Sequence, residues 1–75
     1  MEEFTLTQIE QKIERGLAAK MIIQNQSDAV VLWATEAGGT NYFKYAPGES
    51  WVVDYDIWAK TDSYGANKIM IGRIS

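Results

Sequence analysis

Apolar side chains recur at helical spacing in the first eighteen residues of the chain. Four of them, separated by three, four and four positions, form one stripe: Leu6, Ile9, Ile13 and Leu17. Polar residues that favour helices fill most of the positions between them. Thr7 followed by Glu10 fits a capping box, and Gly16 fits a carboxyl-terminal stop. The pattern predicts a short amphipathic helix, assigned to residues 1–18 as a separate amino-terminal unit.

The first three stripe positions follow the a–d–a order of a coiled-coil seam, and the next d position is Gly16. A seam this short cannot hold an oligomer alone. It can add to contacts between neighbouring copies, or insert into a groove on another protein. It can equally cover the open side of its own domain. We expect the four stripe residues to form an assembly interface.

From Lys20 onward, short β-branched and aromatic runs alternate with turn residues. The predicted strands span residues 20–24, 29–35, 42–45, 51–55, 57–60 and 68–74. Pro47-Gly48 fits a type II turn. The spacing predicts a mainly β fold over residues 19–75: a small antiparallel β-sandwich or barrel of five to six short strands, preceded by the helix. The side chains predicted to form its core are Ile23, Val31, Val53, Ile69 and Ile71.

Composition narrows the possible chemistry. The chain has 75 residues with neither cysteine nor histidine, so disulfides, thiolate metal sites and the commonest general base are excluded. Asp54 and Asp56 lie two apart, but no calcium-loop pattern follows them, and we interpret them as a solvated pair. The sequence therefore predicts no enzymatic activity, no metal and no cofactor.

Charge and hydropathy argue against two classes of partner. The net charge is −3 and no block of like charge occurs, which argues against nucleic-acid binding. The longest apolar run, residues 29–34, is too short to cross a bilayer. The first residues lack the basic start and apolar run of a secretory signal. We expect a protein made in the cytoplasm that does not act at a membrane.

Three tryptophans and four tyrosines are a heavy aromatic content for so small a core. Such rings either stack on sugars or bases, or fill a core or a subunit interface. The candidate ligand or interface aromatics are Trp33, Tyr42, Tyr45 and Trp58.

One family resemblance covers residues 22–74. A strand ends in Asn25-x-Ser27 and is followed by Val30-Val31-Leu32; further on come Tyr45-x-Pro47-Gly48-Glu49-Ser50, Ile57-Trp58-Ala59 and Ser63-x-Gly65 before a last strand. This order resembles small β-sandwich virion proteins of tailed bacteriophages, which decorate the capsid, form head fibres or sit in the tail. The resemblance implies a non-enzymatic structural protein of the virion, with itself and capsid or tail subunits as partners. A homotrimer is the first expectation.

Two other functions remain open from the sequence. A carbohydrate-binding or host-attachment module would use the exposed aromatics. A small inhibitor or immunity-type protein would cap an enzyme through an acidic face. The identity of the neighbouring genes distinguishes the virion hypothesis from these two, because the gene of a virion protein is expected beside capsid, portal or tail genes.

Overall fold

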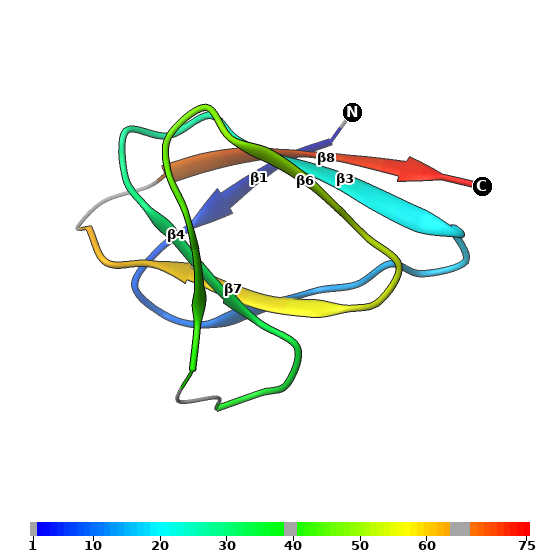
Figure 1. Cartoon of the computed structure of the whole chain (residues 1–75), viewed down its shortest axis with the longest axis horizontal. Helices are drawn as coiled ribbons and strands as arrows, with labels where there is room; N and C mark the ends of the chain where they lie inside the picture. Colours follow the sequence, from blue (N-terminus) through cyan, green and yellow to red (C-terminus); the bar gives the residue numbers. More distant parts are fainter. Residues whose placement is uncertain (1, 39–40, 64–66) are drawn as a thin grey trace.

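The computed structural model describes residues 2–38, 41–63 and 67–75 (Figure 1). Within these ranges every regular element is a β-strand. In chain order the strands are β1 (Glu2–Leu6), β2 (Gln11–Ile13), β3 (Lys20–Asn25), β4 (Val31–Ala34), β5 (Phe43–Tyr45), β6 (Ser50–Val53), β7 (Ile57–Thr61) and β8 (Asn67–Ile74).

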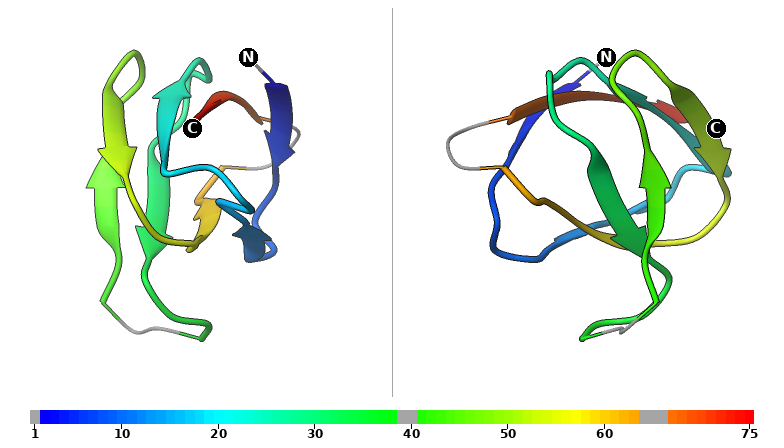
Figure 2. Two further views of the ribbon diagram at one scale, coloured as in Figure 1. Left: turned by 90° about the vertical axis from the view of Figure 1, so that its right-hand side faces the viewer. Right: turned by 60° about the vertical axis from the view of Figure 1, so that its left-hand side comes forward.

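The strands form two four-stranded sheets in which every pairing is antiparallel. Sheet A has the order β1-β8-β3-β6, and sheet B has the order β2-β7-β4-β5. The chain changes sheet after β1, β2, β3, β5, β6 and β7. The two sheets lie in separate layers, and the edge strands β5 and β6 lie on the same side of the molecule (Figure 2).

One apolar core lies between the sheets. Alternate residues of each strand point into it, because successive side chains of a strand face opposite ways. Sheet A contributes chiefly Leu6, Met21, Ile23, Ile69 and Ile71, and sheet B contributes Ile13, Val31, Trp33, Ile57 and Ala59. The five side chains predicted as core are each at most 4% exposed, so that prediction is confirmed.

The mainly β, antiparallel architecture is confirmed, but the predicted amino-terminal helix is wrong. Residues 2–6 and 11–13 form β1 and β2, which pair with β8 and β7. The hydroxyl of Thr7, expected to cap a helix, instead accepts a hydrogen bond from Ile9 N at 3.2 Å within the turn that joins the two strands. Pairing with strands that lie far away in the sequence therefore overrides the local helical pattern.

The predicted count of five to six strands is also wrong, because the described residues contain eight. Each predicted strand between residues 20 and 74 is present; the additional two are β1 and β2. The predicted turn at Pro47-Gly48 is confirmed: Gly48 has φ +86°, and Glu49 N donates to Ala46 O at 3.1 Å. Gly65, part of the resemblance, lies outside the described residues.

Candidate interaction surfaces

The outer face of sheet A carries an unusual number of apolar side chains. On β3, β6 and β8 the residues that alternate with the core positions face outward, and five of them are apolar or lack a side chain. We call these five the sheet A patch: Ile22, Val52, Met70, Gly72 and Ile74. Val52 is 57% exposed and Ile74 is 38% exposed. An antiparallel sheet with one solvated face normally places polar residues at such positions.

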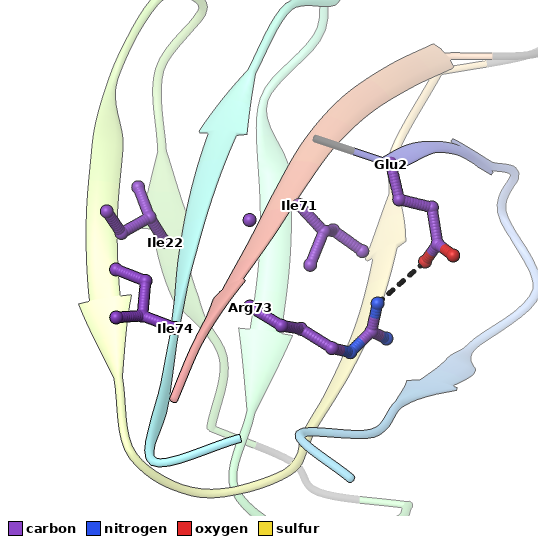
Figure 3. Close-up of a pocket in the computed structure, with 6 residues that line it drawn as sticks. Glu2, Ile22, Ile71, Arg73 and Ile74 are labelled. Carbon is purple, nitrogen blue, oxygen red and sulfur yellow. Dashed lines mark hydrogen bonds and ion pairs between the residues drawn. The ribbon is translucent and has the colours of Figure 1, made fainter. Parts of the chain in front are cut away.

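A hollow of about 540 Å³ opens at the end of the patch (Figure 3). Ile22 and Ile74 lie on one side of it, and Arg73 and Glu2 lie on the other. Arg73 Nη1 donates to Glu2 Oε1 at 2.9 Å, and Nε and Nη2 both donate to Glu14 O. The guanidinium therefore makes three hydrogen bonds to two acceptors within the chain and serves to hold β1 and the end of β2 against β8.

The outer face of sheet B is covered differently. Trp58 and Lys60 alternate with the core residues of β7 and so face outward. Lys12 Nζ lies 5.4 Å from the Trp58 ring centroid, and Lys60 Nζ lies 4.6 Å from the Tyr42 ring centroid. Lys12 also lies 3.7 Å from a carboxylate oxygen of Asp56. Each of these two rings thus has an ammonium group close to it.

A hydrogen-bonded carboxylate completes this face. The Tyr42 hydroxyl donates to Glu10 Oε1 at 2.5 Å, and Gly38 N donates to Glu10 Oε2 at 3.0 Å. Both bonds favour the ionised carboxylate, so they hold the pKa of Glu10 below its ordinary value of 4.5. The same bond to Glu10 raises the pKa of Tyr42 above 10.0. These contacts tie Gly38 and Tyr42 to Glu10, the residue just before β2.

Four aromatic rings close the side of the molecule where β5 and β6 lie. Trp33 stacks on Phe43 with ring centroids 4.7 Å apart, and Tyr45 stacks on Trp51 at 4.1 Å. Trp33 and Trp51 are buried, whereas Phe43 is 58% exposed. The indole N–H groups of both tryptophans are buried without a hydrogen-bond partner. The stack is therefore chiefly a packing element, with Phe43 as its accessible end.

The candidate aromatics consequently divide into two pairs. Trp33 and Tyr45 belong to this stack between the sheets, and Tyr42 and Trp58 belong to the outer face of sheet B. The structure does not bring the four together into one site. The alternation Ile57-x-Ala59 against Trp58-x-Lys60 signals the outward position of Trp58, because a lysine shares its face.

The four residues of the predicted stripe also divide. Leu6 is fully buried and Ile13 is 1% exposed, so both belong to the core and cannot form an intermolecular seam in the folded chain. Ile9 and Leu17, in the connections after β1 and β2, are 76% and 106% exposed. An assembly contact through these two side chains stays a prediction.

Asn25 is a structural residue that the sequence did not single out beyond its turn. Its side chain is fully buried. Nδ2 donates to Ala29 O at 2.8 Å and to Tyr45 O at 3.2 Å, and Oδ1 accepts from Ser27 N and Ser27 Oγ. Asn25 formally begins a glycosylation motif, but its amide is engaged in holding β3 to the following turn and to β5.

The side chain of Asp56 and the backbone of Asp54 both accept hydrogen bonds from Arg15. Asp56 Oδ1 accepts from Arg15 N at 2.8 Å, and the backbone carbonyl of Asp54 accepts from Arg15 Nη1 at 2.9 Å. Among the described residues, no group of three metal-ligating side chains comes together. Across the same ranges, no helix has the length and apolar character needed to cross a membrane.

Comparison of the chain with protein-family models, with curated proteins and with solved structures found no match.

Proposed function

We propose that the chain is a non-enzymatic structural protein of a tailed-bacteriophage particle, a capsid decoration, head-fibre or tail component that acts through protein–protein assembly. Its partners are further copies of itself and capsid or tail subunits, and its location is the virion. The β-sandwich family that it resembles in sequence motivates the virion assignment.

The observation that carries the assembly role is the sheet A patch. Its apolar centre, Ile22 and Val52, is bordered by charged or polar side chains on the same face, including Lys20, Gln24 and Lys68. An apolar centre inside a polar rim is the usual anatomy of a protein–protein interface. Covering such a face would also stabilise a domain whose size limits its core.

Carbohydrate binding has less support from the geometry. A sugar stacks on an aromatic ring through the ring face. A lysine ammonium lies over each of the two candidate rings, 5.4 Å from the Trp58 centroid and 4.6 Å from the Tyr42 centroid. Trp33 and Trp51 are stacked on other rings and buried. A glycan would have to displace Lys12 or Lys60, so we do not propose this function.

The test uses particles that carry the gene. We expect the protein to be detected by mass spectrometry in density-purified virions, in fixed proportion to the major capsid or tail protein. A deletion of the gene should remove it from the particle, and purified protein added afterwards should bind to the deletion particles in a saturable way. Absence from purified virions, together with no binding to deletion particles, would contradict the proposal.

A further inference from the structure

The four edge strands of the two sheets differ in how they are protected. Strands β1 and β6 are the edges of sheet A, and β2 and β5 are the edges of sheet B. An unpaired edge presents free backbone N–H and C=O groups to any second strand, and proteins commonly block such edges with charged side chains. β1 carries Glu2 and Glu3, β2 carries Lys12, and β5 carries Lys44.

β6 is the exception among these described edges. Its residues are Ser-Trp-Val-Val, with no charge and no proline. It pairs with β3 alone, and it lies at the outer side of sheet A next to β3 (Figure 2, left). Val52, at its centre, is 57% exposed. The edge is therefore available for pairing and lacks the usual protection against it.

The sheet A patch leads directly to this edge. Gly72, Ile22 and Val52 lie side by side across β8, β3 and β6, so the apolar row ends at the free side of β6. A strand added at β6 would continue this row. If the added strand is β6 of a second copy of the chain, its own Val52 and Ile22 extend the apolar row across the junction.

We propose that two copies pair antiparallel through β6, around a two-fold axis at Val52, to make one eight-stranded sheet. In an antiparallel pair, opposite residues share a face. A centre at Val52 places Val52 against Val52 on the outer face and Trp51 against Val53 on the inner face. Ser50 then lies opposite Asp54, and Glu49 opposite Tyr55, so no like charges meet.

Other centres are less favourable. A centre at Trp51 places Glu49 against Val53, which is 4% exposed, so that the carboxylate loses its water; the centre at Val52 places it against Tyr55, which is 42% exposed. A centre between two residues would place outward side chains opposite inward ones. The pairing is isologous and closes as a dimer. The proposed dimer rests on the assembly role proposed above and specifies one contact for it. A dimer takes the place of the trimer that the resemblance implies.

The absence of native cysteine gives a direct test on purified protein. Residues directly opposite in an antiparallel pair have Cα atoms about 4.5–5.5 Å apart, within the roughly 4.4–6.8 Å that a disulfide spans. Val52→Cys should therefore form a covalent dimer under mild oxidation. Thr5→Cys is the matched control, since Thr5 is exposed on the outer face of β1 at the opposite edge. Equal rates of dimer formation for the two variants would overturn the pairing.

A second pair of variants tests association without a covalent bond. Wild-type protein should sediment at twice the 8.5 kDa chain mass. Val52→Glu places two carboxylates against each other at the axis and should sediment as a monomer with an unchanged circular dichroism spectrum. Thr5→Glu should behave as wild type. A wild type that is monomeric at every concentration, or trimeric, would overturn the inference, whereas failure of virion binding alone would count only against the proposed function.

Discussion

Both sheets carry large apolar side chains on their outer faces, but the two faces differ in what surrounds those side chains. On sheet B, the apolar area of Trp58 lies near the ammonium group of Lys12, and Tyr42 lies near that of Lys60. On sheet A, the corresponding central positions hold Ile22 and Val52, with Val52 mostly exposed.

The difference shows two solutions to the same problem. A sheet that is apolar on both faces must either cover its second face within the chain or leave it to a partner. Long lysine side chains near aromatic rings shield apolar area while keeping their charge in water. Short aliphatic side chains beside Gly72 offer a low surface that another protein can approach closely. We therefore expect the outer face of sheet B to matter for stability and that of sheet A for association.

The largest predicted difference in the free energy of unfolding is between substitutions on the inner and the outer face of sheet A. Ile23 and Ile22 are neighbours on β3, but Ile23 is fully buried and Ile22 belongs to the patch. Ile23→Ala should lower the free energy of unfolding by about 2–5 kcal/mol because it leaves a cavity. Ile22→Ala, the matched control, should lower it by less than about 1 kcal/mol. Urea denaturation of the monomeric Val52→Glu background measures both; equal losses would mean that the outer face is covered within the monomer.

A smaller effect should separate the two outer faces. Trp58 is half-buried and lies directly across from Ala34, which is 3% exposed. Trp58→Ala exposes the apolar surface around Ala34 and should lower the free energy of unfolding by about 1–2 kcal/mol. This loss is smaller than the loss expected for replacing a fully buried tryptophan. Val52→Ala should change it by less than about 0.5 kcal/mol when each variant is compared with wild type at concentrations low enough for all three proteins to be monomeric. If Val52→Ala is the more damaging, the assignment of stability to sheet B and association to sheet A is wrong.

The strands after residue 20 could be predicted because their signals are local. β-branched and aromatic runs bounded by turn residues mark each of them, and Pro47-Gly48 fixes one turn by itself. The inward face followed from alternation, as Val53 and Ile69 illustrate. These segments can therefore be assigned as strands without knowing which distant strand each one pairs with.

The amino-terminal strands could not be predicted in this way. Leu6 and Ile13 are seven residues apart, a spacing that suits two turns of a helix as well as the inward ends of two short strands. What decides between them is the pairing of β1 with β8 and of β2 with β7, which is not local. The sheet A patch was missed for a related reason: which face of β3 and β8 is outward becomes clear only when both sheets are in place.

The hydrogen-bonded pair Glu10 and Tyr42 on sheet B makes part of the stability of the protein depend on pH. Because hydrogen bonds from Tyr42 and Gly38 lower the pKa of Glu10, their stabilisation is present above pH 4.5 and is lost as the pH falls through the folded pKa. Because the pKa of Tyr42 is raised, its stabilisation is present below pH 10.0 and is lost as the pH rises through the folded pKa. On the outer face of sheet A the charged pair is Lys68 and Glu3, whose Nζ and Oε1 atoms lie 3.0 Å apart between two exposed side chains.

We expect the Glu10 carboxyl resonance to titrate with a midpoint below 4.5 in wild-type protein and to move toward 4.5 in Tyr42→Phe. It should stay slightly below, because the Gly38 N–H bond remains. Tyr55→Phe, which alters an exposed tyrosine instead of the half-buried Tyr42, should leave the midpoint unchanged. An unchanged midpoint in Tyr42→Phe would show that the hydroxyl does not bond to Glu10 in solution.

The smallest effect should come from the charge above Trp58. Lys12 has a side chain 44% exposed, 3.7 Å from Asp56 and 3.8 Å from Glu14. Exposed ion pairs and cation–π contacts contribute little, and a methionine keeps most of the apolar cover, so Lys12→Met should lower the free energy of unfolding by less than about 0.5 kcal/mol. Lys44→Met removes the same charge from β5, at the opposite edge of sheet B, and serves as the control. A loss above about 1 kcal/mol for Lys12→Met alone would mean that the ammonium group, rather than its apolar stem, protects sheet B.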